Sequence, residues 1–91
     1  MVPGVGSYVW LPCEVRPGPF PNERMIRVRG LGGEWVGFVD TGLLREPVEE
    51  GDTKVRALVL QVAGDRVRAQ ILGEPLGATL VEEQARRVEI A

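Results

Sequence analysis

The sequence predicts an all-β protein that forms one small, closed barrel of five strands. Its apolar residues fall into five short runs rich in Val, Ile, Leu and Trp, each ended by Gly or Pro, a pattern typical of strands joined by turns. The chain has 91 residues, enough for one hydrophobic core. Five short strands in an open sheet would expose their edges, so we expect the sheet to close on itself.

Composition excludes most catalytic chemistry. Hydrophobic residues make up 44% of the chain and charged residues 26%, which supports a folded core and argues against disorder. The formal net charge is −2, so the chain is not a basic nucleic-acid coat. With no His and a single Cys, Ser-His-Asp triads, Cys-His pairs and zinc sites built from several His or Cys are excluded. We therefore expect a non-catalytic protein without cofactor or metal.

The same composition bears on location. One cysteine, Cys13, cannot form an internal disulfide, and residues 1–6 lack the basic and apolar regions of a signal peptide. No apolar stretch is long enough to span a membrane. We expect a cytoplasmic protein, from a thermophilic source given the scarcity of Asn and Cys.

The first predicted strand covers residues 7–15. Apolar residues alternate along it, so one face consists of Val9, Leu11, Cys13 and Val15. Pro12 lacks an N–H, so the strand should lie at an edge or carry a bulge there. The proline-rich residues 16–23 form an extended loop.

The next two strands are predicted over residues 24–30 and 34–39. The first directs Ile26 and Val28 to one side, and Leu31-Gly32-Gly33 supplies the turn between the two strands. Residues 43–46 have room for a single helical turn. The segment 46–52 holds four acids and no base, which indicates a solvated loop.

The last two strands are predicted over residues 54–63 and 66–72, joined by a Gly64-Asp65 hairpin turn. The first is apolar on both faces near its middle, as expected of a central strand covered on both sides. The second alternates cleanly, with three side chains turned inward, Val67, Ala69 and Ile71.

Residues 74–91 form a C-terminal extension to the barrel, which covers residues 7–73. Thr79 and Glu82 have the spacing of a capping box, and Val81, Ala85 and Val88 follow at helical spacing. This predicts a short amphipathic helix over 80–88. A strand over 80–90 is the alternative.

Five strands with a helical turn between the third and fourth is the element order of an OB barrel. An SH3-like barrel has a similar number of strands and similar turns, so it remains an alternative. Strand pairing distinguishes the two, because the first strand of an OB barrel pairs with the fourth.

The segments Gly37-Phe38-Val39-Asp40-Thr41-Gly42-Leu43-Leu44 and Gly51-Asp52, with residues 55–67, resemble the third strand and the fourth-strand hairpin of S1-type RNA-binding domains. The resemblance covers about residues 5–73. It implies an OB fold that binds RNA, with Phe38 and Asp40 facing outward and Trp35 and Val39 filling the barrel. Three positions depart from the family pattern, because Asp40 replaces a His, Gly42 replaces a Ser, and Phe20-Pro21 stands where the family has Phe-Gly.

OB barrels bind oligonucleotides across their second and third strands, by stacking on aromatic rings and by arginine contacts to phosphate. The candidate nucleic-acid-binding residues on this face are Phe20, Arg27, Arg29, Phe38 and Arg68. The simpler interpretation is that these arginines form a solvated face paired with glutamates and that Phe38 packs in the core. An uninterrupted basic stripe would favour single-stranded RNA, and a glutamate-neutralised face would not.

The alternative hypothesis is a protein-interaction or assembly module. The net negative charge, the acidic segment 46–52 and the missing aromatic and His residues favour it. Such a module would dock on a partner protein through the loop that carries Phe20 or through the C-terminal segment.

Overall fold

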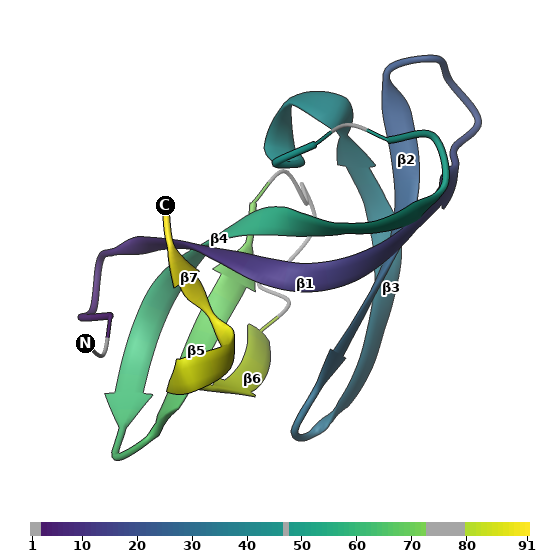
Figure 1. Cartoon of the computed structure of the whole chain (residues 1–91). Helices are drawn as coiled ribbons and strands as arrows, with labels where there is room; N and C mark the ends of the chain where they lie inside the picture. Colours follow the sequence, from purple (N-terminus) through teal and green to yellow (C-terminus); the bar gives the residue numbers. More distant parts are fainter. Residues whose placement is uncertain (1–2, 47, 73–79) are drawn as a thin grey trace.

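The computed structural model describes residues 3–46, 48–72 and 80–91. Over these residues the chain is mostly β-strand, and the sheet curls into a nearly closed barrel (Figure 1). The elements are β1 (Tyr8–Pro17), β2 (Glu23–Gly30), β3 (Gly33–Asp40), the 3-10 helix η1 (Thr41–Leu43), β4 (Gly51–Ala63), β5 (Arg66–Ile71), β6 (Leu80–Gln84), the 3-10 helix η2 (Ala85–Arg87) and β7 (Glu89–Ile90).

The sheet is organised around β1. The strand order is β3-β2-β1-β4-β5-β6, and β7 adds to β1. All pairs are antiparallel, and β1 pairs with β4 along residues 8–15 and with β2 along residues 14–17. Figure 1 shows β1 crossing the molecule between the β2–β3 hairpin and the β4–β5 hairpin. The first strand therefore joins the two halves of the barrel.

The barrel comes nearest to closure where the β2–β3 turn meets β6. The Leu31 N–H donates a hydrogen bond of 2.8 Å to the Glu82 carbonyl oxygen. Gly30 packs so closely there that a Cβ atom on it would lie 2.6 Å from that same oxygen. A residue without a side chain is needed at this position, because β6 occupies the space that a side chain would take.

Aliphatic side chains from all the longer strands fill the interior. The predicted inward faces are confirmed, since alternate residues of each strand are buried; the core includes Val9, Leu11, Cys13, Val15, Ile26, Val28, Val67, Ala69 and Ile71. These β-branched and aliphatic residues favour extended backbone and pack well on a pleated surface. Burial, with a smaller contribution from Asp52, raises the pKa of the Cys13 thiol to about 12, so this side chain behaves as a small hydrophobe.

The two aromatic residues of β3 face opposite ways. Trp35 packs against the core, and Val39 is buried beside it in the same alternation. Phe38 points outward and is 49% exposed. The Trp35 ring lies over Gly37, where an added Cβ would come within 2.5 Å of the ring. The expectation that Phe38 packs in the core is therefore wrong.

Pro12 lies where, among the described residues, no strand pairs with one side of β1. The Val59 N–H donates to the Ser7 oxygen, whereas the Ala91 N–H donates to the Tyr8 oxygen. The backbone N–H and C=O groups of the even-numbered residues of β1 therefore point away from β4. On that side β7 pairs at residues 9–10 and β2 begins at residue 14. Pro12 falls between them, as expected of a strand proline at a locally open edge.

The predicted C-terminal helix over 80–88 is wrong. Residues 80–84 form β6, which pairs with β5 along its length, and η2 and β7 follow. Val81 and Ala85 are buried, but in strand alternation and not along a helical face. Pairing with the exposed edge of β5 satisfies the backbone and overrides the local helical spacing. Thr79 of the capping box lies outside the described residues, as does the predicted boundary at 73–74.

The extension adds strands to the predicted five, so the described residues contain seven. The predicted helical turn at 43–46 is also displaced. It forms at Thr41–Leu43, where the Asp40 carboxylate accepts a hydrogen bond of 2.7 Å from the Gly42 N–H. This side chain satisfies a donor at the start of the turn, which fixes the turn directly after β3.

The fourth strand is not covered on both sides. β4 begins at Gly51, three residues before the prediction, so it takes the last two residues of the expected acidic loop. Its inner residues are buried, but Arg56 and Leu60 on the outer side are exposed. The apolar residues near its middle flank a register shift between Val59 and Gln61. Leu60 faces outward by ordinary alternation after the buried Val59, and the shift returns Val62 to the inner side.

Candidate functional site

The outer surface of β2 and β3, called the β2–β3 face here, carries most of the predicted binding residues. Cross-strand pairs define its rows: Met25 lies opposite Phe38, Arg27 opposite Val36, and Arg29 opposite Glu34. On the other side of β2, Glu14 of β1 lies opposite Arg27. The face is thus an apolar row and a mixed row, followed by a charged row at the hairpin end.

Glutamates neutralise both predicted arginines of this face. Arg29 contacts Glu34 at 3.2 Å and Glu14 at 3.2 Å. The Arg27 Nε lies 3.7 Å from the second oxygen of Glu34. Exposed ion pairs of this kind add little stability, but they cancel the positive potential that would attract phosphate.

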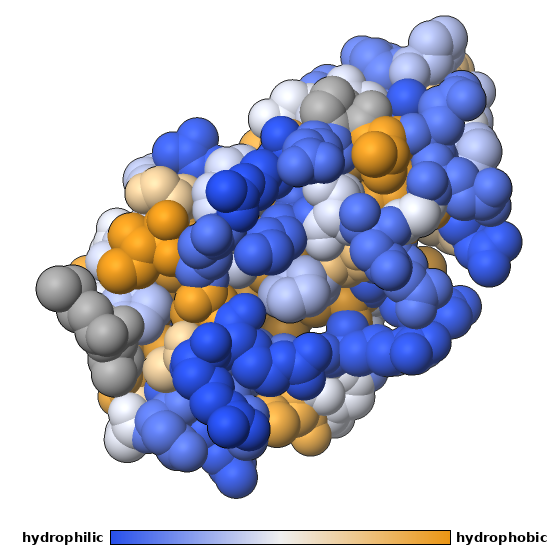
Figure 2. Space-filling view, viewed as in Figure 1, coloured by the Kyte–Doolittle hydropathy of each residue, from blue (hydrophilic) through white to orange (hydrophobic). Residues whose placement is uncertain are grey.

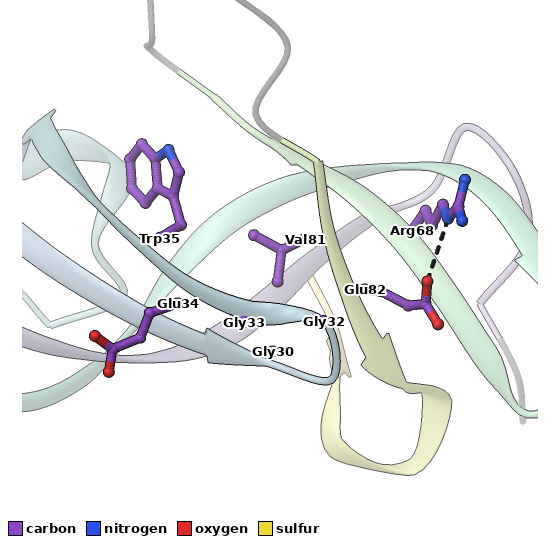
Figure 3. Close-up of a pocket in the computed structure, with 8 residues that line it drawn as sticks. All are labelled: Gly30, Gly32, Gly33, Glu34, Trp35, Arg68, Val81 and Glu82. Carbon is purple, nitrogen blue, oxygen red and sulfur yellow. Dashed lines mark hydrogen bonds and ion pairs between the residues drawn. The ribbon is translucent and has the colours of Figure 1, made fainter.

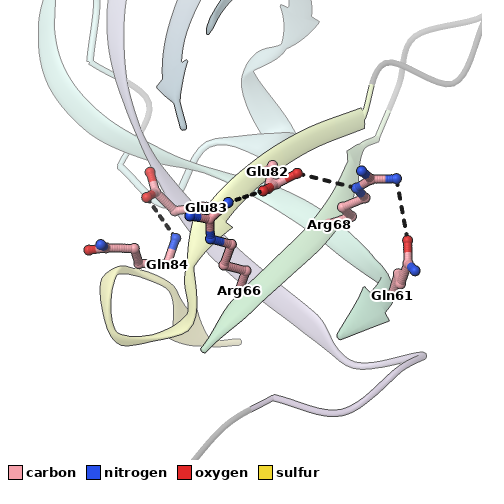
Figure 4. A network of polar contacts seen from close by, with 6 residues as sticks. All are labelled: Gln61, Arg66, Arg68, Glu82, Glu83 and Gln84. Carbon is pink, nitrogen blue, oxygen red and sulfur yellow. Dashed lines mark hydrogen bonds and ion pairs between the residues drawn. The ribbon is translucent and has the colours of Figure 1, made fainter. Parts of the chain in front are cut away.

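Arg68 belongs to a different cluster, on β5 and β6 (Figure 4). Its Nε donates a hydrogen bond of 3.3 Å to Glu82, and its Nη1 contacts Gln61 at 3.4 Å. Arg66 donates to the other Glu82 oxygen at 3.0 Å. Two arginines therefore share one carboxylate, and both of its oxygens are occupied.

A hollow of about 310 Å³ is lined jointly by the β2–β3 turn, the start of β3 and side chains of this cluster (Figure 3). Its lining residues come from the turn, β3, β5 and β6: Gly30, Gly32, Gly33, Glu34, Trp35, Arg68, Val81 and Glu82. The charged side chains among them, Glu34, Arg68 and Glu82, are each held in an ion pair. A basic stripe across Arg27, Arg29 and Arg68, which would favour RNA binding, is therefore interrupted by Glu34 and Glu82.

Phe20 projects from a loop that is itself well anchored. The Glu23 N–H bonds to the Phe20 oxygen at 3.0 Å, and the Arg24 guanidinium donates to the carbonyl oxygens of Pro21 and Val48. The Phe20 residue is nonetheless 63% exposed. It does not fold over the end of the barrel, so a fixed loop presents an aromatic ring to solvent.

The side of the molecule seen in Figure 2 is mostly hydrophilic. Hydrophobic atoms appear there only as separate patches between charged and polar groups. Scattered apolar residues are normal on a soluble protein, so this side by itself indicates no docking surface.

No family model matches the chain, and comparison with curated proteins and with solved structures found no match. Among the described residues, no helix is long and apolar enough to cross a membrane. The same residues contain no cluster of His, Cys, Asp or Glu that could hold a metal ion.

The roles of two acids that neutralise arginines of the site, Glu14 and Glu82, are not predicted from the sequence. Alternation along the first strand does not predict the contact of Glu14 with Arg29, because that contact depends on the register of β1 against β2. The predicted helix over 80–88 includes Glu82, and a helix there gives no reason to expect its ion pairs with Arg66 and Arg68. The alternation of β3, in contrast, already places Val36 on the same side as Phe38.

We predict a pH-dependent contribution from Glu82. Hydrogen bonds from Arg66 and then Arg68 hold the pKa of this carboxyl below its ordinary value. The stabilisation is present above the unfolded-state pKa near 4.5 and is lost as the pH falls through the lowered folded-state pKa. Glu82→Gln should therefore lower Tm at neutral pH, and the Tm difference from wild type should vanish in acid.

Thermal unfolding followed by circular dichroism across this pH range measures the effect. Glu49→Gln, at an exposed position outside the cluster, is the control and should leave Tm unchanged. A Tm difference for Glu82→Gln that stayed constant into acid would contradict the ion-pair explanation.

Proposed function

We propose that the chain is a non-catalytic protein-interaction module on a barrel of the OB type. The pairing of β1 with both β2 and β4 supports this type over an SH3-like barrel, and so does the position of η1 between β3 and β4. OB barrels serve as binding scaffolds through their exposed strands and loops, and fold alone does not name the ligand.

The observation that carries the proposal is the contrast between neutralised arginines and an uncovered aromatic ring. Arg27 and Arg29 are held by Glu34 and Glu14, so phosphate would have to displace an existing carboxylate. Phe20, in contrast, is presented on an anchored loop. Aromatic residues that insert into a pocket of the partner supply much of the affinity of protein interfaces.

We expect Phe20→Ala to weaken partner binding strongly. The wild-type chain, immobilised and exposed to its host's soluble proteins, should retain a partner that Phe20→Ala loses, with affinity reduced about tenfold or more. Val5→Ala, which shortens another exposed apolar side chain, is the matched control and should retain the partner. If no retained protein is sensitive to Phe20→Ala, docking through this loop is wrong.

A second candidate function, binding of single-stranded RNA, is favoured by one observation. Phe38 is exposed beside Met25 on the outer side of β3, where a base could stack on its ring. The two functions differ in their response to salt, because phosphate contacts weaken steeply as salt rises.

Fluorescence anisotropy with a labelled RNA of about 10 nucleotides distinguishes them. The protein-interaction proposal predicts a Kd no tighter than about 1 mM at about 50 mM salt. A tighter Kd that weakens sharply at about 200 mM salt would favour RNA binding instead. Phe38→Ala should then reduce the affinity, and Leu60→Ala should not.

A further inference from the structure

β3 is an edge strand whose outer side has no strand partner among the described residues. The Thr41 N–H bonds to the Asn22 oxygen at 2.9 Å, which fixes the alternation along the β2–β3 ladder. Odd-numbered residues of β3 bond to β2. Glu34, Val36 and Phe38 therefore direct their N–H and C=O groups away from it. These groups form a template for another extended strand.

The middle of this edge lacks the usual protection against pairing. Residues 35–39 contain no charged residue and no proline, and the register with β2 is regular. Val36 and Phe38 are both about half exposed, at 50% and 49%. Charges occur only at the two ends, as Glu34 and Asp40, both on the outer face. The edge is thus apolar at its centre and acidic at both ends.

We propose that β3 pairs antiparallel with β3 of a second copy of this chain, with the two-fold axis at Val36. The inference goes beyond the proposed function, because it uses a surface other than the Phe20 loop. In this register Val36 lies opposite Val36 of the second copy, and Phe38 lies opposite Glu34 of the second copy. Glu34, Val36 and Phe38 then all pair with residues of β3 in the second copy.

Charge selects this register over its neighbours. A two-fold axis at Gly37 would place Glu34 opposite Asp40 of the second copy, twice, and like charges directly opposite are destabilising. An axis at Trp35 would place Phe38 opposite Gly32, in the turn beyond the strand. With the axis at Val36, each Glu34 keeps its ion pair with Arg29 of its own copy. Phe38 therefore lies opposite a glutamate whose charge is already neutralised.

The dimer predicts a mass in solution of twice the 10.0 kDa of the chain, measured by light scattering after size exclusion. Val36→Lys places two ammonium groups opposite each other at the axis and should give monomers. Leu60→Lys adds the same charge at a similarly exposed residue of β4 and should stay dimeric. A monomeric wild type would overturn the proposal and leave the edge to a strand of a different protein.

Cross-linking tests the register independently of any folding defect in Val36→Lys. In Val36→Cys the two Cα atoms would lie about 5.5 Å apart, within disulfide range, so mild oxidation should give a covalent dimer. In Phe38→Cys the two cysteines would be about 13 Å apart and should not cross-link. Cys13 is buried and does not compete. Cross-linking through residue 38 but not residue 36 would overturn the register.

Discussion

Gly30→Ala is expected to lower the free energy of unfolding by about 3 kcal/mol, because its Cβ has no room against β6. The added atom would lie 2.6 Å from the Glu82 carbonyl oxygen and 2.9 Å from Val81 Cγ1. Backbone cannot move aside as a flexible side chain can, so the β2–β3 turn must shift away. That shift also stretches the hydrogen bond from Leu31 to Glu82.

Gly32→Ala is the matched control for this prediction. Gly32 lies in the same turn, an added Cβ there would meet nothing within 4 Å, and its φ is not positive. Its unfolding free energy should therefore change by no more than about 0.5 kcal/mol. Urea denaturation of both variants measures the difference. Equal stabilities would show that the contact between Gly30 and β6 does not hold the barrel together.

Leu11→Ala should cost a similar amount, about 3 kcal/mol. Leu11 is 1% exposed and lies opposite Val55 at the centre of the β1–β4 pair. Truncation removes buried methyl groups and leaves a cavity that the surrounding Val side chains fill only in part. A loss of this size is a large fraction of the stability of a small domain.

Leu60→Ala provides the comparison, because it removes the same atoms from a residue that is 41% exposed. Its effect should stay below about 1 kcal/mol, since little apolar surface is uncovered. Thermal or urea unfolding of the two leucine variants measures the loss of unfolding free energy in each. A Leu11→Ala variant as stable as Leu60→Ala would contradict the position of Leu11 in the core.

The sequence predicted the strands whose alternation is unbroken and failed where a charged residue faces inward. Residues 7–15 and 66–72 alternate cleanly, and the structure confirms their buried faces. In β6 the inward residue between Val81 and Ala85 is Glu83, which is 2% exposed. Its carboxylate accepts a hydrogen bond from the Gln84 N–H at 2.8 Å. Because Glu83 is charged, the sequence shows no apolar alternation over Val81, Glu83 and Ala85. The helical spacing of Val81, Ala85 and Val88 is therefore the pattern that the prediction follows.

The sequence predicts only those features of the candidate site that depend on one strand or on one short turn. Outward arginines follow from alternation, and the Leu31-Gly32 turn brings Arg29 opposite Glu34. The contact between Glu14 and Arg29 depends on how β1 is placed against β2 across the proline-rich loop. Local sequence does not fix that placement, because packing of the whole barrel sets it.

The central position of β1 has a consequence for how the chain folds. The β2–β3 hairpin and the β4–β5 hairpin can each form from neighbouring residues. β1 precedes both hairpins in the chain, but it cannot complete its pairing until β4 is in place, because Tyr8 pairs with Leu58. Closing so long a loop is slow, so we expect assembly on the millisecond-to-second scale typical of non-local β-proteins. During synthesis, β1 therefore remains without its main partner until β4 has been made.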